Sequence, residues 1–141
     1  MGQENKKILG KGSILFHSRF EFANGELGEK LIIILNDPDP TKEPYLTARV
    51  TSQQKNRPKT FGCHSKSSLF SLPAGSDFFE KDTWIQLYEI FAFETSSLLK
   101  DFFDGALRRM GDLKPVTIQQ LINCIRTIKD IERKYKKMIL R

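Results

Sequence analysis

Hydroxyl, amide and cationic side chains gather between residues 49 and 57 of the chain. Hydroxyl and amide groups donate hydrogen bonds and cations neutralise charge, so this combination suits the phosphates of a polyanion such as RNA. The residues that we expect to contribute are Arg49, Thr51, Ser52, Gln53, Lys55 and Arg57. The same residue types also suit a polar turn between two strands, and on residue types alone both interpretations stay open.

Two proton transfers are needed to cleave RNA without a metal ion. One group takes the proton from the 2′-hydroxyl and another protonates the leaving 5′-oxygen, while cations or donors stabilise the charge on the phosphoryl group. Lys30, His17 and His64 are residue types that can move these protons. A single histidine is more often a surface or hydrogen-bonded residue than a catalyst, so both interpretations of His17 and His64 stay open.

The motifs of several other enzyme classes are absent from the sequence. It has no glycine-rich phosphate loop, no dinucleotide-binding fingerprint, no HExxH or CxxC zinc motif and no GxSxG hydrolase motif. Cys63 and His64 are adjacent, so in a strand they would point to opposite faces and would not easily share one ion. We therefore expect neither a metal site nor a cofactor.

Cysteine usage and hydropathy predict a compartment. Cys63 and Cys124 are far apart, and we interpret both as thiols in a reducing cytosol, either buried as small side chains or idle. No stretch approaches the roughly 20 apolar residues of a membrane span, and neither a secretion signal nor a myristoylation pattern follows Met1. The sequence therefore predicts a cytoplasmic protein without membrane attachment.

The length of 141 residues is that of one domain, and the net charge is +6. This charge suits RNA, DNA or an acidic protein as a partner. The segment from Arg126 to Arg141 is dense in lysine and arginine, so part of the charge lies outside any central site. We expect a flexible lead over residues 1–9, a domain over 10–115 and an amphipathic basic helix over 116–141.

Apolar periodicity and turn residues predict the secondary structure. Strands are expected over residues 13–22, 31–35, 45–52, 61–64, 70–72, 83–88 and 107–111. Helices are expected from Thr95 or Ser96 to Gly105, and from Thr117 past Tyr135. Residues 23–30 carry an Asn-Gly turn signal but are expected to form a mobile loop.

The order of these elements predicts the fold class. Residues 31–35 are apolar throughout and predict a strand buried on both faces, near the sheet centre. The next strand follows too closely for a parallel crossover, so the pair is expected to be antiparallel. We predict a mainly β fold with helices (α+β), a small curved antiparallel barrel with a late short helix and a long C-terminal helix.

Four short segments match, in order, the landmarks of one protein family. They are Gly12–Leu15, with Ser13 where the family has Asp; the loop 24–29 with the strand 30–36; Val50–Gln53; and 107–113 followed by a helix. Residues 82–90 lie where the family has its Asp-Gln-Ile/Leu strand. From residue 10 to residue 131, the chain resembles the MazF/PemK family of toxin endoribonucleases.

The resemblance implies an SH3-like barrel, a homodimer and metal-independent cleavage of single-stranded RNA, with an antitoxin protein blocking the site. The family's catalytic Thr/Ser maps to Thr51, with Ser52 beside it, and its catalytic Arg maps to Lys30. Lys30 departs from the pattern, and Leu31 replaces the Pro that normally follows. Arg grips a phosphate with a planar fork, whereas Lys is a point charge whose pKa falls when it is buried, so that it can act as a base.

Two functions stay open. In a toxin-like endoribonuclease, Thr51 would stabilise the phosphate and Lys30 would act on the proton or the charge. RNA would be positioned by Arg49, Ser52, Gln53, Lys55 and Arg57, with His64 as a further RNA-contacting and acid–base group. The alternative is a non-catalytic SH3-like module that binds a partner protein or nucleic acid through the same rim. Independently, the basic C-terminal helix could dock an acidic antitoxin or a nucleic acid.

Overall fold

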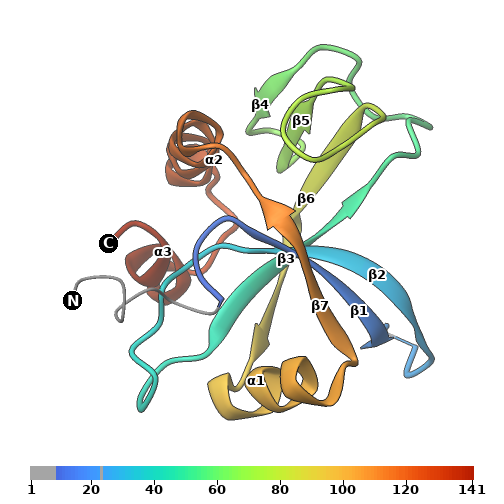
Figure 1. The fold of residues 1–141 in the computed structure, drawn as a ribbon. Helices are drawn as coiled ribbons and strands as arrows, with labels where there is room; N and C mark the ends of the chain where they lie inside the picture. Colours follow the sequence, from blue (N-terminus) through green and yellow to red (C-terminus); the bar gives the residue numbers. More distant parts are fainter. Residues whose placement is uncertain (1–8, 23) are drawn as a thin grey trace.

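Seven strands and three helices make up the computed structural model, which describes residues 9–22 and 24–141 (Figure 1). The strands are β1 (Ser13–Glu21), β2 (Leu27–Ile34), β3 (Tyr45–Thr51), β4 (Gly62–His64), β5 (Leu69–Leu72), β6 (Thr83–Phe93) and β7 (Leu107–Asp112). The helices are α1 (Thr95–Asp104), α2 (Pro115–Thr127) and α3 (Arg133–Ile139). The predicted mixed α+β class is confirmed.

All seven strands form one sheet, in the order β4-β5-β6-β3-β2-β1-β7. Each neighbouring pair is antiparallel. For β2 and β3 this arrangement was predicted, because the connection between them is too short for a parallel crossover. Strands β4 and β7 end the order, and within the described residues the sheet is not closed into a barrel. The structure therefore shows an open antiparallel sheet with helices.

The inner strands of the sheet pack against core residues on both faces, and successive side chains of each strand alternate between the two faces. In β2, Ile33 packs into a core cluster that includes residues of α2, whereas Ile32 and Ile34 pack into a second cluster with Leu98 of α1. In β3, Ala48 and Val50 belong to the first cluster. The prediction that residues 31–35 are buried on both faces is confirmed for Ile32 to Leu35, whereas Leu31 is only partly buried.

The sheet bends at β6. Between the pairs Thr47–Phe91 and Arg49–Gln86, β6 advances five residues while β3 advances two. Extra residues on one strand increase its twist and re-aim its side chains. Beyond the bulge, residues 91–93 pair with residues 45–47 of β3, so β6 extends to Phe93, past the predicted end at residue 88.

The β1–β2 connection is a hairpin rather than the mobile loop that we predicted over 23–30. Strand β2 begins at Leu27, which pairs with Glu21, and the Phe22 amide donates to the Glu26 carbonyl at 2.9 Å. Gly25 has φ 85°, a conformation that glycine adopts without strain. The Asn-Gly turn therefore suffices to reverse the chain; Ala23 lies outside the described residues.

The C-terminal region is two helices, so the prediction of one long helix over 116–141 is wrong. Ile128 has extended backbone angles and ends α2, and α3 begins at Arg133. Ile128 and Ile131 are both buried in the first core cluster. The apolar spacing thus continues across a break, because these two side chains reach the core from a non-helical connection.

The N-terminal lead ends earlier than predicted. Leu9 is buried in the second core cluster, although we placed it in the flexible segment 1–9. The Tyr45 hydroxyl donates to the Leu9 carbonyl at 3.1 Å. Residues 1–8 lie outside the described residues.

A disulfide joins Cys63 of β4 to Cys124 of α2, with the two Cα atoms 5.4 Å apart. The interpretation of both cysteines as thiols is therefore wrong. Their separation of 61 residues gave no sequence signal, because only the fold brings β4 against α2. Across the described part of the chain, no helix has the length and apolarity needed to cross a membrane.

Candidate functional site

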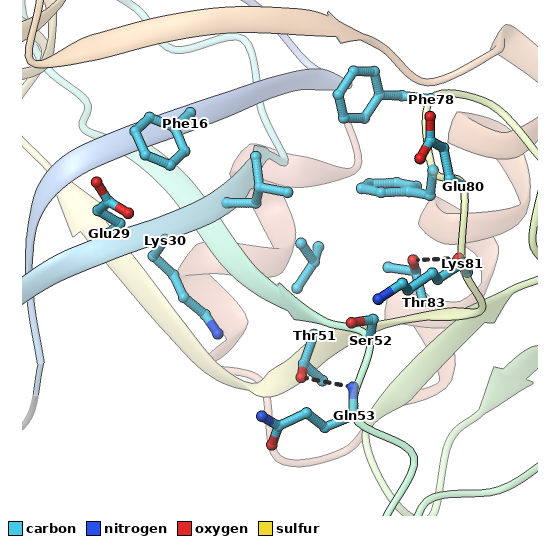
Figure 2. A pocket seen from close by; sticks show the side chains of 13 residues that line it. Phe16, Glu29, Lys30, Thr51, Ser52, Gln53, Phe78, Glu80, Lys81 and Thr83 are labelled. Atoms are coloured by element: carbon cyan, nitrogen blue, oxygen red, sulfur yellow. Dashed lines mark hydrogen bonds between the residues drawn. The ribbon is translucent and has the colours of Figure 1, made fainter.

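A groove of about 730 Å³ opens where β2 and β3 separate (Figure 2). The recorded pairing of these strands runs from Ile34–Thr47 to Ile32–Arg49. Continuing the same register by two residues would place Lys30 opposite Thr51, and both side chains line the groove. The two residues that the sequence analysis predicted to be catalytic therefore line the same groove.

The groove has an apolar lining that continues the core. Leu31, Val50 and Phe79 all line it; Val50 and Phe79 are buried in the first core cluster, and Leu31 packs against it. Leu31 also pairs with Phe16 of β1, another lining residue. Anchoring in the core fixes the positions of the polar residues around the rim.

The polar residues divide into two groups in the view of Figure 2. Lys30, Thr51, Ser52 and Gln53 lie on one side, with Lys81 extending toward Ser52. Along the other side lie Glu29, Phe16, Phe78 and Glu80. Cations and hydroxyls thus lie on one side of the apolar lining, and aromatic rings and carboxylates lie on the other.

Lys30 is half-buried, and its environment disfavours the ammonium form. Burial lowers its pKa from 10.5, and the positive charges of Arg49 and Arg57 lower the pKa further. Among the described residues, no carboxylate lies within ion-pairing distance of Lys30. A lysine in this setting gives up its proton more easily than usual, and when charged it is available to an external anion.

Thr51 is oriented by its own turn. Its Oγ1 accepts a hydrogen bond from the Gln53 backbone amide at 3.2 Å. This bond occupies a lone pair and leaves the hydroxyl proton free to donate. Ser52 and Gln53 are exposed beside it. The end of β3 therefore presents donors, as its residue types suggested.

Arg49 does not line the groove. Its Nη2 contacts Glu89 Oε1 at 3.2 Å, and its guanidinium carbon lies 5.3 Å from the centre of the Phe91 ring. Its Nε is buried without a hydrogen-bond partner. Arg49 thus acts on the groove through its charge, which lowers the pKa of Lys30, rather than through contact.

The other proposed RNA-binding residues lie farther along the chain. Arg57 Nη1 donates to the Gln53 carbonyl at 2.7 Å, which keeps its charge near Lys30. Lys55 is exposed in the same turn but does not line the groove. His64 is on β4, where its Nε2 lies 2.8 Å from the Thr60 carbonyl oxygen, and it does not line the groove either.

His17 does not line the groove, although it pairs with Lys30 across β1 and β2. It is buried, and its Nδ1 accepts the backbone N–H of Arg19 at 3.1 Å. The ring proton is then on Nε2, which lies 3.2 Å from Asp101 Oδ2 on α1. His17 therefore ties α1 to β1.

Sequence reasoning missed the wall supplied by residues 73–82. Asp77 holds this loop to the start of α2: its Oδ1 accepts the Lys114 amide at 2.6 Å, and its Oδ2 accepts the Thr117 hydroxyl at 3.0 Å. Of the two adjacent aromatic residues in this loop, Phe79 is buried in the core, whereas Phe78 is 39% exposed at the groove.

No protein-family model matches the chain, and no curated protein matches it in sequence. In the described part of the chain, no three or more His, Cys, Asp or Glu side chains form a group that could hold a metal ion.

Proposed function

We propose that this protein is a toxin-like endoribonuclease that cleaves single-stranded RNA without a metal ion. One observation carries the proposal: Lys30, with a lowered pKa and no carboxylate partner among the described residues, lines one groove with the hydroxyl of Thr51. Metal-free RNA cleavage requires a base or cation and a donor in such an arrangement.

The chemistry assigns a role to each side chain. The 2′-oxygen attacks the adjacent phosphorus, and the new 2′-O–P bond forms as the bond from phosphorus to the 5′-oxygen breaks. The products are a 2′,3′-cyclic phosphate and a 5′-hydroxyl, because the leaving 5′-oxygen takes a proton from water in the open groove. Neutral Lys30 accepts the 2′-hydroxyl proton, and the lowered pKa makes a larger fraction of this amine neutral than in an ordinary lysine. Thr51 donates its hydroxyl proton as a hydrogen bond to a phosphoryl oxygen, where negative charge develops.

The MazF/PemK resemblance supports this proposal and extends it. It maps the family's catalytic positions to Lys30 and Thr51, which line the same groove. By the same resemblance, we propose that the curved sheet is a relative of the SH3-like barrel, that the protein forms a homodimer, and that an antitoxin protein blocks the groove.

The cytoplasm is the compartment that fits this substrate. The disulfide is the observation against it, because disulfides persist mainly in oxidising compartments. Alkylation of free thiols in intact cells, followed by mass spectrometry, distinguishes the two states. Cytoplasmic residence predicts alkylated Cys63 and Cys124, whereas an oxidising compartment predicts that the bond survives.

The test of catalysis uses purified protein and a mixed single-stranded RNA in EDTA. Lys30→Ala and Thr51→Ala should each abolish most of the cleavage. Lys66→Ala is the matched control, because Lys66 is an exposed lysine in the turn between β4 and β5. Cleavage that is unchanged in Lys30→Ala and Thr51→Ala would overturn the site assignment.

A second function is favoured by the residue at position 30 itself. Lysine cannot reproduce the bidentate phosphate grip of the arginine that the resemblance leads us to expect there. A non-catalytic module would bind RNA or a partner protein at the groove without cutting. Binding of a labelled RNA that Lys30→Ala weakens, with no cleavage by the unaltered protein, would favour this alternative over the enzyme.

A further inference from the structure

The loop over residues 73–82 is held by its own hydrogen bonds. The Gly75 amide donates to the Phe79 carbonyl at 2.9 Å, and the Ala74 amide donates to Asp82 Oδ1 at 2.8 Å. Asp77 attaches the loop to α2 through the two bonds described above. With Phe79 buried in the core, the loop presents Phe78 at the groove from a fixed backbone.

Phe78 is seated on neighbouring groups that restrict its ring. A Cβ atom added at Gly111 of β7 would lie 3.4 Å from a Phe78 ring carbon, so the ring rests against the backbone of that strand. Its centre lies 5.6 Å from that of Phe79 in an edge-to-face arrangement. A rigid, part-exposed aromatic ring in a groove that also holds cations is an arrangement on which nucleic-acid bases stack.

The charges around Phe78 orient a nucleic acid across the groove. Lys30, with its hydroxyl neighbours, lies on the side that suits phosphates (Figure 2). Glu80 lies next to Phe78 on the opposite side, where a carboxylate repels phosphate but accepts hydrogen bonds (Figure 2). The exposed edges of single-stranded bases offer hydrogen-bond donors for this carboxylate.

From these observations we propose that Phe78 and Glu80 form a base-binding subsite. The phosphate backbone lies along the Lys30 side, one base stacks on Phe78, and Glu80 accepts a hydrogen bond from the exocyclic amino group of that base. Uracil has no amino group and flanks its one ring N–H with two carbonyl oxygens, so the subsite disfavours it. The proposal rests on the proposed function only in taking single-stranded RNA as the ligand.

The experiment measures binding separately from cleavage. Fluorescence anisotropy follows labelled 2′-O-methyl hexamers of cytosine, adenine or uracil, which lack the attacking hydroxyl and are not cut. The unaltered protein should bind the cytosine and adenine hexamers more tightly than the uracil hexamer. Phe78→Leu, which keeps apolar bulk but loses the ring, should weaken binding of all three about tenfold.

Two further variants make the test specific. Phe78→Trp keeps an aromatic face and should bind as tightly as the unaltered protein. Glu80→Gln, which offers both donor and acceptor, should bind all three hexamers without the preference against uracil. Thermal unfolding of each variant checks that the fold is intact.

The outcomes separate this proposal from that of catalysis. Phe78→Leu binding like the unaltered protein, a preference that survives in Glu80→Gln, or no hexamer binding by the unaltered protein would each overturn the subsite. Binding with the expected preferences, in a protein that leaves ordinary RNA intact, would support the subsite and refute the ribonuclease.

Discussion

Lys30 and Arg49 are two cations on the same face of neighbouring strands, yet their surroundings differ. Arg49 is in the paired part of β3, opposite Ile32, where Glu89 and the Phe91 ring bind its guanidinium. Lys30 lies two residues beyond the end of that pairing, where the strands separate and a groove begins. Within the described chain, no acid partners Lys30.

The difference shows how one sheet face both maintains the fold and presents reactive groups. A cation on a paired part of a strand contacts a partner on the adjacent strand, and its charge then stabilises the fold. A cation at the open end keeps its charge or its lone pair for a ligand. Arg49 still contributes at a distance, because its charge helps to lower the pKa of Lys30.

The largest expected effect on activity comes from removing Lys30, the cation at the open end of the β2–β3 pair. Lys30→Gln should lower kcat/KM for RNA cleavage by about 10²–10⁴-fold, the usual contribution of a general base. Lys30→Arg should fail to restore activity, since a guanidinium stays protonated and cannot accept the 2′-hydroxyl proton. Full activity in Lys30→Arg would instead show that Lys30 stabilises charge. Arg49→Gln is the comparison, because it removes the cation that lies in the paired part of β3.

Removing the disulfide should have the opposite result to removing Lys30: it should lower the stability of the fold and leave catalysis unchanged. Replacing Cys63 and Cys124 together by Ser should lower the free energy of unfolding by about 2–4 kcal/mol, because a covalent loop of this length restricts the unfolded chain. Urea denaturation measures the change. RNA cleavage under native conditions should stay within twofold of the unaltered protein; a tenfold loss would mean that the bond also shapes the groove.

The sequence predicted the strand side of this comparison well. The continuous apolar run of residues 31–35 predicted a strand buried on both faces, and the polar run after Val50 marked the strand end that borders the groove. These features depend on neighbours along the chain, and period-2 burial follows from strand geometry.

The other wall of the groove could not be predicted in the same way. Phe78 and Phe79 look equivalent in sequence, and only the bonds from Asp77 to α2 decide which one the core receives. Partners far apart in the chain also determine that Arg49 meets Glu89 and that Cys63 meets Cys124. The break at Ile128 was hidden because its apolar spacing matches that of a helix.

The paired cation should have a smaller effect than the disulfide. Arg49→Met removes the contact with Glu89 and the stacking on Phe91, and should lower the free energy of unfolding by about 1 kcal/mol. It should also raise the pKa of Lys30 and move the rising limb of the cleavage pH profile upward, because a nearby positive charge is lost. Glu89→Gln is the control: it breaks the ion pair, keeps the guanidinium, and should not move that limb upward.

The smallest expected effect is on the alkaline pH dependence of stability, to which Lys30 and Tyr45 contribute with opposite signs, because burial raises the pKa of the Tyr45 hydroxyl. The pKa of Lys30 in the folded protein lies below the ordinary value of 10.5 because burial and the two arginines disfavour the charged form. Between these two pKa values the Lys30 side chain holds a proton in the unfolded chain that it has lost in the folded protein, so the contribution of Lys30 to the free energy of unfolding rises with pH in that window. Below it, both states are protonated, and the penalty for holding the charged amine in the groove is fully present. Lys30→Gln should therefore flatten the rise, as measured by urea denaturation at several alkaline pH values, whereas Lys66→Gln should leave it unchanged. An equally steep rise in Lys30→Gln would show that the groove does not disfavour the ammonium, and the contrast between the open-end and the paired cation would then fail.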